Sequence, residues 1–117
     1  MDNASIKSKI LVTGGSSRFC KYLKKDLKNF KAIFPTRKKF DITNYPKIKK
    51  YIKDKKIDII IHIAALSRPM SIHDEFPEKS IDTNIIGTSN IAKVASLLGV
   101  KLIFFSSQYV YPGKKGN

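Results

Sequence analysis

The 117-residue sequence has a single cysteine, few acidic side chains and no long apolar run. One cysteine cannot form an internal disulfide, so we expect a reducing, cytoplasmic setting. No stretch of about 18 or more apolar residues occurs, which argues against a membrane-spanning helix. The first ten residues lack the apolar core of a secretory signal peptide. Internal repeats and low-complexity linkers are also lacking, so the length fits one modest domain.

Acidic residues are scarce, since nine Asp and Glu stand against 23 Lys and Arg, a formal net charge of +14. The excess lies in residues 1–56, which hold 17 basic and four acidic side chains. Such a basic half could attract nucleic acid, an anionic membrane or phosphorylated ligands. Arginine is rare, however, and the lysines fall mainly on the polar faces of expected helices. We therefore favour a solvated lysine-rich surface, and we expect neither a membrane nor a nucleic-acid partner.

Apolar runs alternate with amphipathic segments along the whole chain. The runs predict buried strands over residues 8–13, 31–36, 57–65 and 101–107, with a strand stub over 40–43. Helical spacing predicts helices over residues 18–30, 45–56 and 77–98. Thr43 or Asn44 is the expected cap of the second helix, and Gly99 the expected end of the third. This alternation predicts an α/β fold, a Rossmann-like doubly wound parallel sheet with helices on both faces.

Polar segments follow three of the expected strands at their carboxyl ends. They are TGGSSR at residues 13–18, AALSR at 64–68 and SSQYVYPG at 106–113. Open parallel sheets bind ligands at this edge, so we expect the three segments to form one site. Gly14 allows a tight turn and Gly15 a close backbone approach. Ser16 and Ser17 add hydroxyl donors for phosphate near a helix N-terminus. Taken alone, this turn is equally compatible with a plain glycine-rich connection.

In order and spacing, these segments resemble the extended short-chain dehydrogenase/reductase superfamily. The nearest likeness is to the dTDP-4-dehydrorhamnose reductase branch and related NAD-dependent epimerases and dehydratases, and it runs over almost the whole chain. It is carried by KILVTGGSSRFCKYL, FDIT, IDIIIHIAALSRP and DTNIIGTSNIAKVASLLGVKLIFFSSQYVYPG. In the first turn, Ser17 and Cys20 replace the second and third glycines of the family pattern. Cys20 is small and behaves as a hydrophobe, so we interpret it as a buried packing residue.

The resemblance implies a bound dinucleotide, NADP in preference to NAD. Asp41 is expected to accept from the adenine amino group, with Ile42 beside the ring. Arg18 and Arg37 are candidates to pair with a 2′-phosphate, and no acidic residue ends the second strand, where it would favour NAD. The residues that the resemblance assigns to the cofactor are Gly14, Gly15, Ser16, Ser17, Arg18, Phe19, Arg37, Asp41, Ile42, Ala64, Ala65 and Ser106.

The resemblance also implies a catalytic role for Ser107, which stands where the family has a Ser or Thr that hydrogen-bonds the substrate carbonyl or hydroxyl. Gln108 replaces the family's Asp. The catalytic Tyr-x-x-x-Lys pair is expected beyond Asn117, and we interpret His62 as a packed strand residue. Residues 1–117 would then be the NAD(P)-binding Rossmann domain, truncated after the strand that carries Ser107. The C-terminal substrate domain would be absent, with no metal site and no turnover by this chain alone.

By resemblance, the full-length protein would reduce or epimerise a 4-keto nucleotide sugar, which it would bind through the missing C-terminal part. A homodimer of that protein is compatible with the resemblance. Two other function classes stay open. One is a non-catalytic dinucleotide-binding or regulatory module, and the other, with less support, is a basic nucleic-acid-binding domain. A downstream Tyr-x-x-x-Lys would favour the enzyme, and steeply salt-dependent DNA binding would favour the last.

Overall fold

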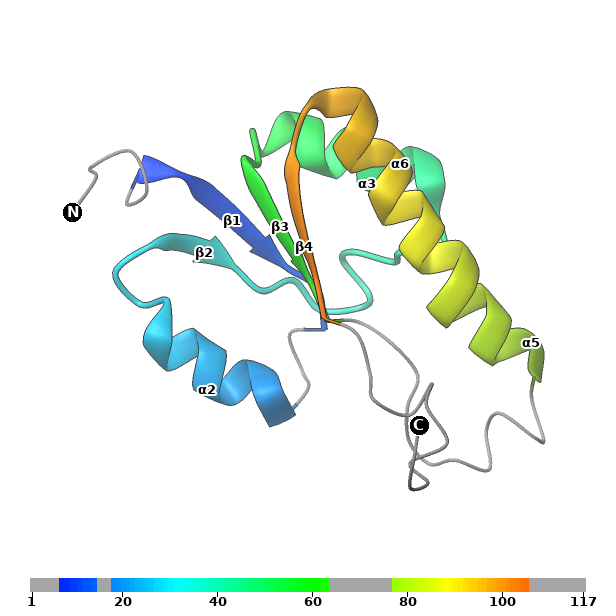
Figure 1. Ribbon diagram of the computed structural model, residues 1–117, viewed down its shortest axis with the longest axis horizontal. Coiled ribbons are helices and arrows are strands. Elements are labelled where there is room, and N and C mark those ends of the chain that lie inside the picture. The colour runs from blue at the N-terminus through cyan, green and yellow to red at the C-terminus, as the bar shows by residue number, and fades with distance from the viewer. Residues whose placement is uncertain (1–6, 15–17, 64–76, 106–117) are drawn as a thin grey trace, which may run out of the picture.

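Four parallel strands form one sheet in the computed structural model, which describes residues 7–14, 18–63 and 77–105 (Figure 1). The order across the sheet is β2-β1-β3-β4, and each neighbouring pair is parallel. The strands are β1 (Lys9–Val12), β2 (Lys31–Ile33), β3 (Ile59–His62) and β4 (Lys101–Phe104). Parallel strands joined through helices confirm the α/β, Rossmann-like prediction.

Helical segments connect the strands. They are α2 (Arg18–Asp26), α3 (Tyr45–Asp54), α5 (Pro77–Ser80), the π-helix η1 (Ile81–Gly87) and α6 (Thr88–Leu98). Asn44, and not Thr43, caps α3, because its side-chain oxygen accepts from the Lys47 amide at 3.2 Å. Gly99 ends α6 in the left-handed region with φ of 66°, as its position predicts.

Two local predictions were wrong. The segment 40–43 is not a strand, because the Asp41 carboxylate accepts from both the amide and the hydroxyl of Thr43 and holds a turn. The first helix ends at Asp26, four residues before the predicted end, and a turn over 27–29 follows. The helix predicted over 77–98 is present, but its middle third is the π-helix η1.

Helices cover both faces of the sheet, α2 on one and α3 with α6 on the other (Figure 1). The chain steps one way across the sheet from β1 to β2 and the other way from β3 to β4. Right-handed crossovers therefore place α2 and α6 on opposite faces. Alternate side chains of the strands fill the two layers, so Leu11 and Ile60 face α3 and α6, while Val12 and Ile61 face α2.

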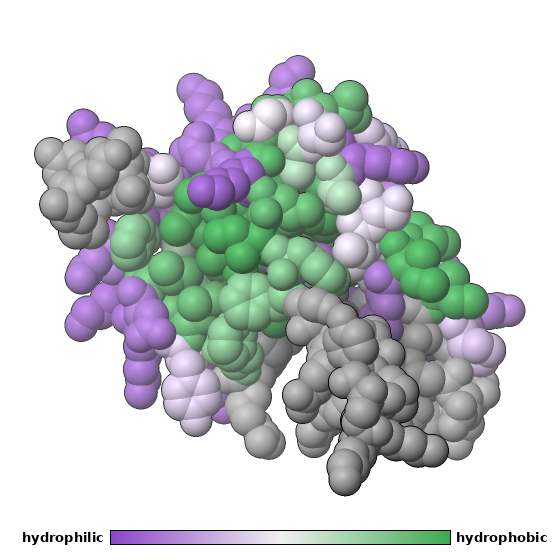
Figure 2. All heavy atoms as spheres, viewed as in Figure 1, coloured by the Kyte–Doolittle hydropathy of each residue, from purple (hydrophilic) through white to green (hydrophobic). Residues whose placement is uncertain are grey.

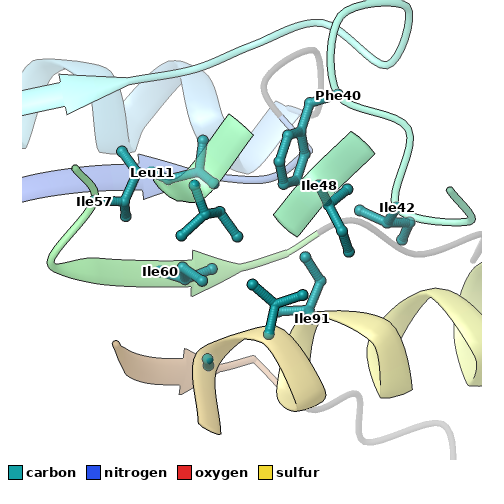
Figure 3. Packing of buried hydrophobic residues seen from close by; sticks show 10 residues of the cluster. Leu11, Phe40, Ile42, Ile48, Ile57, Ile60 and Ile91 are labelled. Carbon is teal, nitrogen blue, oxygen red and sulfur yellow. The ribbon is translucent and has the colours of Figure 1, made fainter. Parts of the chain in front are cut away.

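The larger core lies between the sheet and the α3–α6 layer (Figure 3). Its buried members are Leu11, Phe40, Ile42, Ile48, Ile52, Ile57, Ile60, Ile91, Val94 and Ala95. Phe40 and Ile42 come from the loop after β2, so this loop is anchored in the core and does not only cross the surface. The core thereby fixes the position of Asp41, which stands between them.

Charged side chains lie outside this core. Every lysine of α2 and α3 is exposed, as the expected polar helix faces predict. Figure 2 shows hydrophilic side chains toward the rim and hydrophobic ones gathered in the middle of the view, over the strands. At β4, one of the two edge strands of the described sheet, Ile103, Phe104 and the following Phe105 are exposed. In the described ranges, no helix is long and apolar enough to cross a membrane.

Candidate functional site

The reversal of strand order falls between β1 and β3. The chain leaves β1 for β2, then returns past β1 to form β3. Their connections run to opposite faces, so the backbone parts at the carboxyl ends of these two strands and leaves room for a ligand there. The predicted site segments 13–18 and 64–68 follow these two strands in the sequence, and the third, 106–113, follows β4.

Thr13 joins β1 to β3 at this edge. Its amide donates to the Ile61 carbonyl at 3.0 Å, and its hydroxyl oxygen accepts from the Ile63 amide at 2.9 Å. Gly14 follows with φ of 78°, a left-handed conformation that favours glycine. This conformation of Gly14 is the one that a tight turn requires, as the prediction for this residue expects. Further along the chain, α2 begins at Arg18, and the N-terminal end of a helix favours anions.

His62, the last residue of β3, is 1% exposed. Its Nδ1 hydrogen-bonds the Thr13 hydroxyl at 2.8 Å, and its Nε2 hydrogen-bonds the Thr88 hydroxyl at 2.9 Å. Its ring stacks on Phe104 with centroids 5.6 Å apart. Burial lowers the pKa of His62 to about 4, because the charged imidazolium loses its hydration. At neutral pH the imidazole is uncharged, and its interpretation as a packed strand residue is confirmed.

Asp41 lies in the loop after β2, with Arg37 in the turn that precedes it. Its Oδ1 accepts from the Thr43 hydroxyl at 2.7 Å and from the Thr43 amide at 3.0 Å. These hydrogen bonds, helped by the charges of Arg37 and Lys47, hold the pKa of Asp41 below its ordinary value. The carboxylate is therefore ionised at neutral pH. Among the described residues both bonds use Oδ1, so Oδ2 can accept from a ligand amino group.

The loop that carries Asp41 is held by the junction of η1 and α6. The Asn90 side-chain amide donates to the Ile42 carbonyl at 2.9 Å, and Gly87 packs directly on the Ile42 side chain. Sequence reasoning missed Gly87, Thr88 and Asn90. For Gly87 the signal was a glycine inside a helical pattern. Such a glycine indicates close packing when it does not cap the helix.

Gly87→Ala is expected to lower the free energy of unfolding by about 1 kcal/mol. The added methyl would lie 2.5 Å from Cδ1 and 2.6 Å from Cγ1 of Ile42, which is buried. Overpacking of this kind costs about 1–3 kcal/mol, and the helix preference of alanine offsets about 1. Urea denaturation measures the change. In an Ile42→Ala background, which removes both clashing atoms, the same substitution should cost nothing. Additive losses would contradict the close packing.

The structure places several other predicted residues at the same edge. Phe19, in the first turn of α2, is 44% exposed, and its ring lies 5.2 Å from that of Phe105 just after β4. Cys20 is fully buried against the sheet, as its packing interpretation predicts. Arg18 is the first residue of α2, and only its backbone is described. Gly15, Ser16, Ser17, Ala64, Ala65, Ser106 and Ser107 lie outside the described residues. Among the residues that are described, no cluster of His, Cys, Asp and Glu could hold a metal.

Comparisons with known proteins agree with this arrangement. A family model described as RmlD substrate binding domain matches residues 8–117. Methionine adenosyltransferase 2 subunit beta of Xenopus laevis is 41% identical over 66 residues, which are 56% of this chain and 20% of that protein. UDP-glucose 4-epimerase of Rickettsia bellii is 32% identical over 129 aligned positions, covering 88% of this chain and 38% of the epimerase.

A solved structure matches the fold closely. It is a dTDP-4-dehydrorhamnose reductase from Bacillus anthracis in complex with NADP, with a TM-score of 0.86 and 27% identity. The match covers 94% of this chain and 40% of the reductase, so the chain spans well under half the length of these relatives. The family match over nearly the whole chain, on a parallel sheet of this topology, shows that the chain belongs to the RmlD substrate binding domain family, within the extended short-chain dehydrogenase/reductases that its motifs resemble.

Proposed function

We propose that this chain forms the NAD(P)-binding part of a nucleotide-sugar reductase or epimerase that acts on a 4-keto sugar nucleotide. The observation that carries the proposal is the match of 94% of the chain to a reductase in complex with NADP. The proposal also fits the site itself. A left-handed Gly14 leads toward a nine-residue helix, and an ionised Asp41 follows the neighbouring strand.

The described residues fit a dinucleotide in defined roles. The turn after Thr13 and the N-terminus of α2 would hold the pyrophosphate, because backbone amides and the helix dipole favour anions. Asp41 would accept from the adenine amino group. Arg37, exposed in the turn before Asp41, would pair with the 2′-phosphate of NADP. When bound, the nicotinamide supplies the hydride-transfer chemistry.

The remaining predicted residues complete the proposal. Ala64 and Ala65 would leave space along the cofactor, and Ser106 would support Ser107 in hydrogen-bonding the substrate carbonyl or hydroxyl. Because the chain spans 40% of the matched reductase, we assign substrate selection and turnover to a longer protein. We place that protein in the cytoplasm, since the sequence has a single cysteine.

NADPH is expected to bind the full-length protein about tenfold more tightly than NADH. The reason is a charge-assisted contact between the 2′-phosphate and Arg37, which at an exposed position contributes about 1.4 kcal/mol. Fluorescence titration measures both affinities. Arg37→Gln should remove most of the difference. Lys38→Gln, in the same exposed turn, should leave it within about twofold. Equal affinities of the unaltered protein for NADPH and NADH would refute the NADP preference.

A second candidate function is a dinucleotide-binding subunit without hydride transfer. The observation that favours it is the 41% identity to a protein named as a subunit of methionine adenosyltransferase. NADPH oxidation by the full-length protein, measured with a panel of 4-keto sugar nucleotides, separates the two. Oxidation with any of them supports the enzyme. Tight NADPH binding without oxidation supports the subunit.

A further inference from the structure

We propose that His62 is a positioning residue for the dinucleotide turn, because its imidazole holds the Thr13 hydroxyl and with it the backbone that leads into Gly14. This inference rests on the proposed dinucleotide binding and deepens it. It assigns a role to a side chain that the sequence indicated only as a packed strand residue and that none of the proposed cofactor contacts uses.

The hydrogen bonds of His62 reach two elements besides its own strand. Nδ1 lies 2.8 Å from the Thr13 hydroxyl at the end of β1, and Nε2 lies 2.9 Å from the Thr88 hydroxyl, the first residue of α6. Thr13 in turn accepts from the Ile63 amide at 2.9 Å. One imidazole therefore links the residue before the left-handed Gly14, the residue that follows β3, and the helix that holds the Asp41 loop.

Burial shields the hydrogen bond between His62 and Thr13 from water. His62 is 1% exposed and Thr13 is 2% exposed, so water does not easily replace either partner. A neutral imidazole has one donor and one acceptor, and a threonine hydroxyl can complement either. Each ring nitrogen thus has a suitable partner in both tautomers. The bond to Nδ1 holds the Thr13 side chain in the rotamer that also receives the Ile63 amide, and this fixes the backbone that enters the turn.

Packing and positioning can be separated at this residue. The ring face packs on Phe104, whereas its two edges make the hydrogen bonds. His62→Asn places an amide near the position of Nδ1, so it can keep the Thr13 link and lose the Thr88 link. His62→Gln is longer by one methylene and places its amide near the position of Nε2, so it keeps the opposite link. The two variants remove similar ring contact and differ in which hydroxyl they reach.

The test is an NADPH fluorescence titration of both variants in the full-length protein, beside thermal unfolding of each. We expect His62→Asn to retain NADPH affinity within about threefold. His62→Gln should weaken it about tenfold, the worth of one buried hydrogen bond. The two melting temperatures should drop by similar amounts. Equal NADPH affinities of the two variants, or affinities that follow melting temperature, would show a purely structural role and overturn the proposal.

A second measurement keeps the inference testable if the unaltered protein binds no NADPH, a result that would instead refute the proposed function. The backbone amide signal of Gly14 in NMR spectra reports the turn directly. His62→Gln and Thr13→Val should both shift this signal, whereas His62→Asn and Thr88→Val should shift it much less. An unchanged Gly14 signal in His62→Gln would overturn the positioning role without reference to any ligand.

Discussion

Acidification from about pH 7 to about pH 4.5 is expected to lower the free energy of unfolding by roughly 2–3 kcal/mol through His62 alone. In the folded protein the pKa of His62 is about 4, lowered from 6.5 by burial. The unfolded chain therefore takes up a proton near pH 6.5 that the folded chain does not. Stability from this residue is complete above that pH and is lost as the pH falls from 6.5 toward 4. Urea denaturation at several pH values within this window measures the loss.

The control for this prediction is His62→Asn, which removes the titrating group and keeps a polar partner for Thr13. Its free energy of unfolding should change much less between about pH 6.5 and 4.5. Asp41 contributes little to the pH dependence in this window, because its pKa lies below the ordinary 3.8. Its stabilising contribution is lost only under more acidic conditions. A pH dependence equal in His62→Asn and in the unaltered chain would show that His62 titrates normally in the fold.

Ile60→Ala is expected to lower the free energy of unfolding by about 2–5 kcal/mol, the usual range for a large aliphatic side chain removed from a core. Ile60 is fully buried at the centre of β3, paired with Leu11 on one side and Leu102 on the other. Its side chain joins the strands to the α3–α6 layer, as Figure 3 shows. Chemical denaturation, monitored by circular dichroism, gives the change.

Ile103→Ala is the matched control, since it removes the same atoms from the neighbouring strand at a position that is 40% exposed. We expect a loss of about 1 kcal/mol or less there, because little apolar surface returns to water and little cavity forms. Similar losses at Ile60 and Ile103 would show that the exposed face of β4 is covered in solution and that the edge strand is not free.

Much of the fold could be predicted because it depends on short-range patterns. Apolar runs identified four strands, and a side-chain cap at Asn44 and a left-handed Gly99 marked helix ends. The turn at Gly14 was also readable, because a positive φ favours glycine whatever surrounds it. The wrong strand prediction arose where a side-chain hydrogen bond competes with the backbone pattern. At residues 40–43 an apolar pattern suggested a strand, but the Asp41 carboxylate bonds the Thr43 amide and makes a turn.

The sequence by itself determined the parallel α/β architecture and the expectation of a ligand site at the carboxyl ends of its strands. Periodicity, capping and turn chemistry act within a few residues, so they can be read along the chain. Only the tertiary structure decided what supports the site. His62 meets Thr13 across 49 positions and Thr88 across 26, and Asn90 reaches the Ile42 carbonyl across 48. Such contacts depend on which helix covers which face and at what register, and the pairing of hydroxyl, imidazole and amide follows only once those layers have packed.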